Sequence, residues 1–353
     1  MKAIAVFVAA ISFGLIAPVS AREKQRERPQ DEPASVRRAV PVVSPDDAAR
    51  FLAGLPVSGA LEPLTQTDAW RAHSLELEAA WQRMDVRQLA KVRVWAHGVP
   101  SASALYYFFS GPDFLYANAL FPNVSTYILC AIEPVGAIGE LATLDERQLG
   151  NSLGNLRQSL NSMLRFHYFI TKELRVDLAR DRIGGALPVL YVFLARTGHS
   201  IRSVTPVNNG VKIDFSGAGG KKTLFYFPTD LSNGASNTAF FNFCRQYRGA
   251  VALLKSASYL LHGDGFSKCR DFLLQNSSAI VQDDSGLPFR YFTPENWTVR
   301  LFGTYAGTNG IFAKYQQSDL LNAYHQLTPA PLDFAFGYEA RGDRGTLMIA
   351  TKR

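Results

Sequence analysis

The sequence predicts an α/β protein in which helices flank a mixed sheet. Residues 105–109 and 125–132 are compact apolar runs typical of buried strands, with the helix-like run 114–121 between them. A strand, a short helix and a strand at this spacing favour a βαβ unit with parallel pairing. An antiparallel meander, separated by turn residues, is expected further along. Its three strands are residues 200–204, 211–215 and 223–227.

The first residues have the three-part pattern of a secretory signal peptide. Lys2 gives a positive start, residues 3–17 are mostly apolar, and residues 19–21 form a small-x-small cleavage site. The apolar run is short for a membrane span, which needs about 20 residues. We therefore expect residues 1–21 to be removed and the protein to be exported, to a periplasmic or extracellular location. We expect no transmembrane segment in the mature chain.

Residues 22–44 alternate charged residues with prolines and contain few large apolar residues, which predicts a disordered tether. One α/β domain is expected from residue 45 to residue 353, with helices to about residue 90. Ser44 is a good N-cap and Pro45 a good first residue for a helix. Residues 69–90 predict a second helix with one apolar side.

The middle of the chain predicts two more helices. Residues 144–178 form a long helical region in which leucines recur at helical spacing. Gly184 and Gly185 interrupt this region, and residues 187–195 predict another helix.

The C-terminal part predicts a strand at residues 249–254, and the overlapping apolar run 252–261 is helix-like and ends at His262. A helix is expected at residues 309–326. Four further strands are expected at residues 278–282, 298–305, 332–338 and 346–351. The last two should pair as a C-terminal antiparallel hairpin through residues 341–343.

Carboxylates follow several of the predicted strands. Asp113 follows the first strand, Glu133 the second, Asp230 the meander, and Asp283 with Asp284 a later strand. Ligands of open α/β sheets bind beyond the carboxyl ends of parallel strands. If these strands are parallel neighbours, their carboxylates converge. They could then bind a cation, hydrogen-bond a sugar, or act as a general acid and base.

Asp283 and Asp284 also form a good turn with the serine and glycine after them, so a structural role stays open. We expect one of the two to face the cleft and the other to cap the turn. Asp113 and His262 complete the candidate catalytic set, although a histidine that ends a helix is more often a cap or a dipole partner. The candidate ligand-binding residues are Glu133, Asp230, Tyr291 and Trp297.

Several kinds of site are not indicated. The six histidines lack the spacing of a metal pair, so no metal site is expected. Serine-nucleophile motifs are absent. The glycine-rich residues 217–222 lie between meander strands, which favours a hairpin over a phosphate loop. The net charge of +7 is spread along the chain, so nucleic-acid binding is not expected.

Glu133 lies 20 residues after Asp113 (133 − 113), near where a Rossmann domain places its ribose-binding acid. The glycine fingerprint of such a domain is missing. The sequence is therefore compatible with a degenerate Rossmann-like three-layer core that holds no cofactor. A dinucleotide-like and a methyltransferase-like version of this core both stay open.

Three cysteines are an odd number for an exported chain, so at least one is unpaired or pairs with another chain. Cys130 lies in a strand-like run and is expected to be a buried thiol. Cys244 and Cys269 could form a disulfide, but the sequence cannot place their Cα atoms.

The sequence predicts a binding or structural role in the cell envelope, with an unknown small molecule or an envelope polymer as partner. This hypothesis needs no catalytic constellation. The alternative is a hydrolase of an envelope glycan or polymer that uses the carboxylates at the strand ends, with Tyr291 and Trp297 stacking on sugars. Whether the protein is an enzyme stays open.

Overall fold

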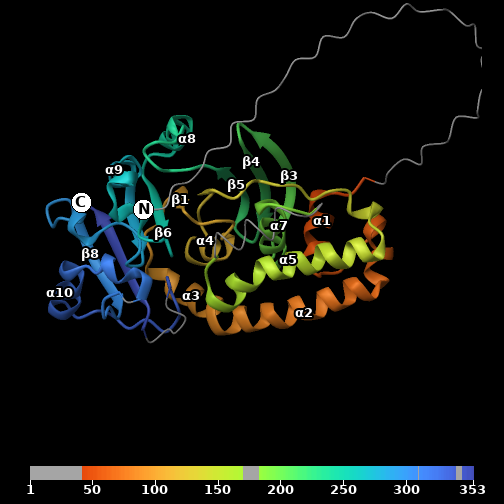
Figure 1. Ribbon diagram of the computed structural model, residues 1–353, viewed down its shortest axis with the longest axis horizontal. Coiled ribbons are helices and arrows are strands. Elements are labelled where there is room, and N and C mark those ends of the chain that lie inside the picture. The colour runs from red at the N-terminus through yellow and green to blue at the C-terminus, as the bar shows by residue number, and fades with distance from the viewer. Residues whose placement is uncertain (1–41, 170–182, 309, 339–343) are drawn as a thin grey trace, which may run out of the picture. The chain divides into compact units, whose positions relative to one another are not determined.

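The computed structural model describes residues 42–169, 183–308, 310–338 and 344–353 (Figure 1). All of these residues belong to one compact unit. The fold is α/β, with a mixed sheet that has helices around it and is not closed into a barrel, as predicted. The predicted signal peptide and most of the predicted tether lie outside the described residues.

One nine-stranded sheet organises the described part of the chain, in the order β3-β4-β5-β2-β1-β6-β7-β9-β8. The strands are β1 (Ala104–Phe108), β2 (Thr126–Ala131), β3 (Ser200–Val207), β4 (Gly210–Gly217), β5 (Gly220–Pro228), β6 (Ala250–Leu254), β7 (Ser277–Gln282), β8 (Trp297–Gly303) and β9 (Thr346–Lys352).

The five central strands, β5-β2-β1-β6-β7, are parallel. The predicted βαβ unit is present, because β1 pairs in parallel with β2 and α4 (Phe114–Leu120) connects them. The predicted meander is confirmed as β3-β4-β5. From β1 the chain adds β2 and β5 on one side of the sheet, then β6 and β7 on the other. The gap between β1 and β6 is therefore the topological switch point, where doubly wound sheets bind ligands.

Alternate side chains of β1 enter two separate cores. Leu105 and Tyr107 belong to a core built with α1, α2, α4, α5 and α7, and Tyr106 and Phe108 to a core built with α8, α9 and α10. The sheet is thus the middle of three layers. Fully burying a side chain such as Phe108 contributes about 1.5–3 kcal/mol. The helices not yet given bounds are α1 (Pro45–Leu52), α2 (Asp68–Met84), α3 (Ala90–Trp95), α5 (Glu146–Phe166), α7 (Ala186–Arg196), α8 (Thr238–Cys244), α9 (Ser267–Asn276) and α10 (Ser318–Gln326).

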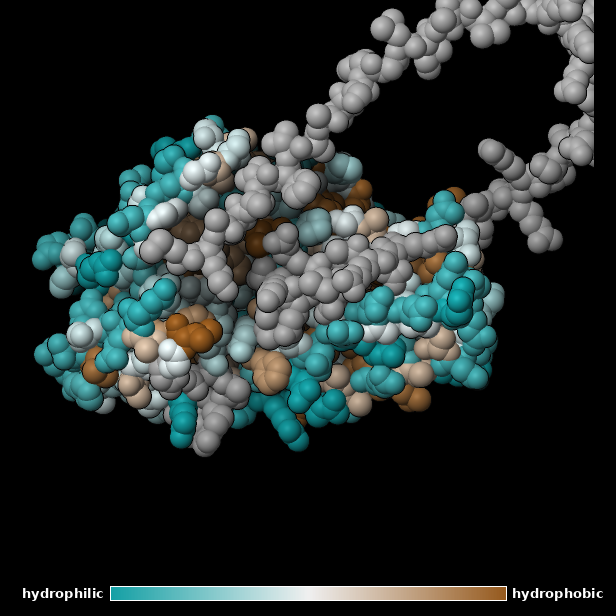
Figure 2. All heavy atoms as spheres, in the orientation of Figure 1, coloured by the Kyte–Doolittle hydropathy of each residue, from teal (hydrophilic) through white to brown (hydrophobic). Residues whose placement is uncertain are grey.

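The two N-terminal helices begin where predicted, and the second is interrupted near its predicted end. Ser44 caps α1, because its Oγ accepts a hydrogen bond from the Asp47 amide at 3.0 Å. The predicted helix 69–90 is divided: α2 ends at Met84, a π-helical turn follows over Asp85–Leu89, and α3 continues. Hydrophilic side chains predominate over α2 on the face seen in Figure 2, as expected for an amphipathic helix.

The long predicted helix is shorter than expected in its described part. Asp145 and Gln148 form a capping box at the start of α5, and α5 ends at Phe166 because His167 has a left-handed φ of 70°. Residues 170–182 of the predicted helix lie outside the described residues. The glycines after it have a clear function: Gly185 has φ 80°, and its Cα lies against the backbone of Gly136, which leaves no room for a Cβ. This close approach joins the loop after β2 to the start of α7.

The predicted strand at residues 332–338 is wrong. The strand with which it was predicted to pair, β9, already pairs with β7 on one side and with β8 on the other. The Gln88 side chain instead bonds the backbone of Ala335, whose amide donates to Gln88 Oε1 at 3.1 Å. Phe334 and Phe336 give this segment the alternating pattern of a strand. Both side chains are buried in the core, but the segment pairs with no strand of the described sheet. The C-terminal strand β9 is therefore antiparallel to both β7 and β8, and the predicted turn at residues 341–343 lies outside the described residues.

Two other predicted helices need correction. The helix-like run 252–261 is the end of β6 followed by a loop, because Ser256, Ser258 and Tyr259 have φ values of 54–56° that a right-handed helix cannot contain. His262 therefore ends a single 3₁₀ turn. The predicted helix 309–326 is a 3₁₀ segment, Gly310–Tyr315, followed by α10, and residue 309 lies outside the described residues.

Cys130, Cys244 and Cys269 are all buried and free, so Cys244 and Cys269 do not form the disulfide considered above. Within the described ranges, every helix is too short or too polar to cross a membrane.

Candidate functional site

A cavity of about 600 Å³ lies at the topological switch point. The residues that follow four parallel strands line it: Ser110 after β1, Ile132 after β2, Thr229 after β5 and Lys255 after β6. Aromatic side chains form much of the remaining wall. They include Phe109, Tyr168, Phe169, Phe266, Phe312 and Tyr338.

The loops that line this cavity carry unusual backbone conformations. Phe109, after β1, has φ 60°, and Ser256 and Ser258, after β6, have φ values of 54° and 56°. A left-handed conformation at a residue other than glycine costs on the order of 1–3 kcal/mol, and such residues cluster at functional sites. Side chains from other elements hold the β6 loop in place. The amide of Ser256 donates to Asp283 Oδ2 at 2.8 Å, and that of Ser258 to the Tyr338 hydroxyl at 3.1 Å.

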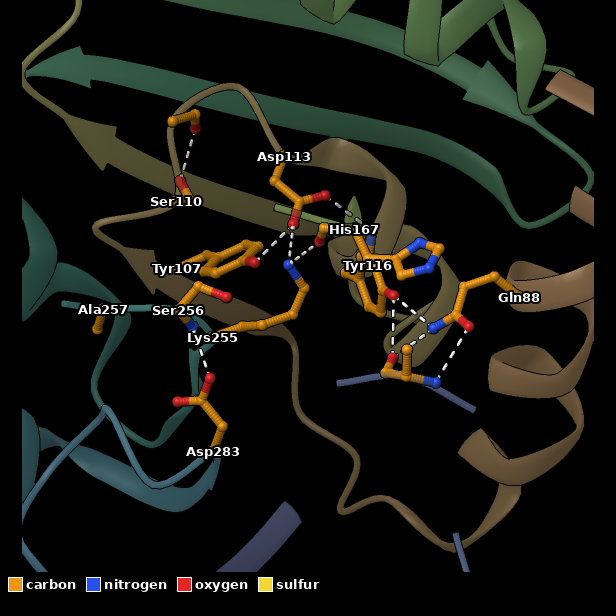
Figure 3. Close-up of polar contacts among 12 residues, drawn as sticks. Gln88, Tyr107, Ser110, Asp113, Tyr116, His167, Lys255, Ser256, Ala257 and Asp283 are labelled. Atoms are coloured by element: carbon orange, nitrogen blue, oxygen red, sulfur yellow. Dashed lines mark hydrogen bonds and ion pairs between the residues drawn. The ribbon is translucent and has the colours of Figure 1, made fainter. Parts of the chain in front are cut away.

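A buried ion pair belongs to the cavity lining and makes up the deeply buried part that we call its floor. Figure 3 shows the pair and its polar contacts. Lys255 Nζ lies 3.2 Å from Asp113 Oδ2, and both side chains are only 1% exposed. The Tyr107 hydroxyl donates to the same carboxylate oxygen at 2.7 Å. Lys255 also donates to the backbone oxygen of His167 at 2.5 Å, and its ammonium lies 4.2 Å from the centre of the Tyr116 ring. Burial, reinforced by the Asp113 charge, raises the pKa of Tyr107, so the phenol stays protonated as a donor.

Asp113 also occupies the N-terminus of α4. Its Oδ1 accepts a hydrogen bond from the Tyr116 amide at 3.1 Å, so it is the N-cap of that helix. Dinucleotide-binding folds place a ligand's pyrophosphate at the N-terminus of the helix that follows the first strand. Here the protein's own carboxylate already fills that position, and Lys255 neutralises it.

Two buried hydroxyls lining the cavity have no hydrogen-bond partner among the described residues. They are Oγ1 of Thr229 and Oγ of Ser256, at the carboxyl ends of β5 and β6. Thr229 is 8% exposed. Buried hydroxyls normally have partners, because an unsatisfied one costs about 1–3 kcal/mol. A ligand with hydrogen-bonding groups would satisfy both.

A second cavity of about 560 Å³ lies at the same edge of the sheet, beyond β7, β8 and β9. It shares Tyr168, Ile311, Phe312 and Tyr338 with the first cavity. An aromatic cluster lies between the two: the rings of Phe312 and Tyr338 are 4.9 Å apart, and those of Tyr168 and Tyr338 are 5.0 Å apart. We call the shared rings of Tyr168, Phe312 and Tyr338 the aromatic partition.

The two predicted aspartates have different surroundings, as expected. Asp283 is buried, and its Oδ1 accepts from the amide and hydroxyl of Ser285, so it holds the turn. Burial raises the pKa of Asp283, and these hydrogen bonds oppose the rise. Gly337, with φ 72°, packs directly on this carboxylate. Asp284 lines the second cavity and accepts a hydrogen bond from the Tyr259 hydroxyl at 2.7 Å.

The other predicted carboxylates only partly converge. Asp113 and Asp230 both line the first cavity. Asp230 is exposed, and its Oδ1 accepts from the Ser232 amide at 2.8 Å. Glu133 is 1% exposed and lies just beyond the cavity-lining residue Ile132. The described carboxylates therefore do not meet in one cleft: two line the first cavity, and Asp284 lines the second.

The remaining predicted residues lie outside both cavities. His262 packs edge-on against the rings of Tyr259 and Tyr315, and burial lowers its pKa to about 4. Tyr291 lies under the guanidinium of Arg270, at 4.8 Å. Trp297 begins β8 and packs on Phe292. The aromatic residues that do line the cavities come from other segments.

Lys255 is the main site residue that the sequence analysis missed. It follows the predicted strand 249–254 directly, and the rule that led to the carboxylates applies equally to a lysine in that place. The sequence pattern predicts a buried strand at Tyr107 but gives no sign that its hydroxyl binds Asp113 at the cavity. No local sequence pattern indicated the aromatic partition, because its residues lie far apart in the chain.

Among the described residues, no group of three or more histidine, cysteine, aspartate or glutamate side chains could hold a metal ion. Comparisons with known proteins give no match to a family model, to a curated protein or to a solved structure.

Proposed function

We propose that the protein binds a small, uncharged organic molecule with an apolar ring body in the first cavity. The observation that carries this proposal is the position of the cavity, which lies beyond the carboxyl ends of β1, β2, β5 and β6 at the switch point. That is where open α/β sheets hold their ligands. The strained loops and the unpartnered hydroxyls of Thr229 and Ser256 point to the same place.

The chemistry of the lining selects the kind of ligand. Aromatic walls favour a flat apolar body. The hydroxyls of Thr229 and Ser256 would fix its orientation through hydrogen bonds. Lys255 is already paired with Asp113, so among the described lining residues no positive charge is free to bind an anion. A phosphate-bearing ligand is disfavoured for the same reason.

Replacing Ile132 with aspartate tests this proposal. Ile132 lines the first cavity and is 48% exposed, so Ile132→Asp places a charge beside the ligand with little effect on the core. We expect the neutral fluorescent probe N-phenyl-1-naphthylamine to bind the natural protein saturably. Ile132→Asp should weaken its binding by about tenfold or more, which is about 1.4 kcal/mol. Fluorescence titration measures both.

The matched control is Leu75→Asp, which adds the same charge at a residue on α2 that is 73% exposed and outside the cavity. It should bind the probe as the natural protein does. The sulfonated analogue 8-anilino-1-naphthalenesulfonate should bind more weakly than the neutral probe. Equal affinity of the natural protein and Ile132→Asp for the neutral probe, or tighter binding of the sulfonate, would contradict the proposal.

We also propose that the protein is exported and acts in the cell envelope, on the sequence pattern of residues 1–21 alone. Cleavage after Ala21 predicts a mature N-terminus of Arg-Glu-Lys-Gln. N-terminal sequencing of the protein from its native cells reads this directly, and a mature chain that still begins at Met1 would refute it.

The alternative of a glycan hydrolase has less support. A pair of catalytic carboxylates works at about 5–10 Å across one cleft. Here Asp283 holds a turn, Asp284 lines the second cavity, and Asp113 is held in an ion pair. Tyr291 and Trp297 are not beside these carboxylates in either cavity.

A further inference from the structure

The second cavity differs in its chemistry from the first. The residues after β7 and β8 and at the start of β9 line it, and most of these are polar: Asp284, Thr304, Thr308, Arg344 and Thr346. Its remaining wall is the aromatic partition together with Tyr259 and Tyr305. The two cavities therefore lie side by side along one sheet edge, one mostly apolar and one more polar.

Arg344 gives this cavity a positive charge. Among the described residues, its guanidinium forms no ion pair and no side-chain hydrogen bond. Thr308, another residue of the cavity lining, has a buried Oγ1 without a hydrogen-bond partner among the described residues. A free planar guanidinium and an unsatisfied hydroxyl are a suitable donor set for a carboxylate, which guanidinium groups bind through two parallel hydrogen bonds.

The aromatic side of the cavity indicates what the carboxylate is attached to. The Tyr259 ring is stacked on the Tyr315 ring at 5.0 Å, with the planes 2° apart, and lies 4.9 Å from the Phe312 ring. This cluster supports the two lining rings of Phe312 and Tyr338, which are only partly buried and can pack against another flat ring. The Asp284 carboxylate, a negative group among the described lining residues, accepts a hydrogen bond from the Tyr259 hydroxyl at 2.7 Å.

We propose that the second cavity is a separate binding site for a small aromatic carboxylate, held by Arg344 and Thr308 against the aromatic partition. The protein would then hold two ligands next to each other at one edge of its sheet. This inference rests on the lining of the second cavity and does not depend on what the first cavity binds.

Titration with benzoate, followed by ligand-observed NMR, tests the proposal, with benzylamine as the probe of opposite charge and similar size. We expect benzoate to bind the natural protein more tightly than benzylamine. Arg344→Gln should weaken benzoate binding at least tenfold, and Arg344→Lys should weaken it less, because lysine keeps the charge but loses the paired hydrogen bonds.

Arg87→Gln is the matched control, since Arg87 is exposed in the turn after α2 and lines neither cavity. It should leave benzoate binding unchanged, and so should Ile132→Asp in the first cavity. Unchanged affinity of Arg344→Gln for benzoate overturns the proposal, and so does tighter binding of benzylamine, which would make Asp284 the recognition group. Loss of probe binding in Ile132→Asp with normal benzoate binding separates the two sites.

Discussion

Replacing Lys255 with methionine is expected to lower the free energy of unfolding by about 3–5 kcal/mol. Removing one partner of a buried ion pair leaves the other charge without compensation, and losses of this size follow. Here the remaining charge would be Asp113, which is 1% exposed and 3.2 Å from the lysine ammonium. The variant also loses the bond to the His167 carbonyl, which ties the end of α5 to β6. Urea unfolding measures the change.

A double variant shows whether the loss comes from the stranded charge. In Asp113→Asn with Lys255→Met, the asparagine carries no charge and can still cap α4 through its side-chain oxygen. We expect the double variant to recover more than half of the stability that Lys255→Met loses. A loss below about 1 kcal/mol in the single variant, or no recovery in the double variant, would contradict the expectation that an uncompensated Asp113 charge destabilises the fold.

Mild acid is expected to destabilise the protein, because burial favours the neutral form of four described histidines, of which His73 is the most deeply buried. His73 is fully buried between α1 and α5. Its Nε2 lies 2.8 Å from the carbonyl oxygen of Leu52, which can only accept, so Nε2 carries the proton. Its Nδ1 faces the Arg157 guanidinium at 3.2 Å and must accept. Protonating Nδ1 would place two donors and two positive charges together.

Burial, with the nearby arginines in support, lowers the pKa of His73 from 6.5 to about 4. For a base with a lowered pKa in the folded state, the neutral form favours folding. The contribution of neutral His73 to the free energy of unfolding is therefore complete above pH 6.5 and is lost as the pH falls toward 4. At about 1.4 kcal/mol per pH unit, the total is about 3 kcal/mol. Burial also lowers the pKa values of His167, His199 and His262 to about 4, which adds to the effect in the same direction.

Melting temperatures between pH 7 and pH 4 test this expectation. His73→Gln removes the titrating group but keeps one donor and one acceptor, so its melting temperature should fall less steeply over this range. His97→Gln is the control, because His97 is exposed in the 3₁₀ turn after α3. An equally steep fall in His73→Gln would mean that other groups cause the acid sensitivity.

Local patterns were enough to predict most of the elements. The aromatic run of β1, the short helix α4 and the apolar run of β2 were identified in order, and their parallel pairing followed from the length of the connection. The N-cap Ser44 and the meander were found for the same reason, because capping and turn chemistry depend on neighbouring residues. Asp113 and Asp230 were placed at the site because both follow a strand.

Other features depended on contacts between distant segments. Residues 332–338 have the alternation of a strand, but β7 and β8 already occupy both sides of β9, and local sequence carries no information about such competition. The apolar run 252–261 looks helical, but its loop takes left-handed conformations that Asp283 and Tyr338 hold from elsewhere in the fold.

The sequence by itself determined that this is an α/β protein with parallel strands whose ends carry charged residues. Only the tertiary structure decided which of those ends meet. The strand order brings Asp113 to Lys255, two residues that lie far apart in the chain, and their charges cancel at the floor of the first cavity. It also moves Asp284 to a second cavity behind an aromatic partition drawn from three separate segments. The physical reason is that strand order and side-chain packing are set by burial across the whole sheet, whereas sequence patterns report only on burial along each strand.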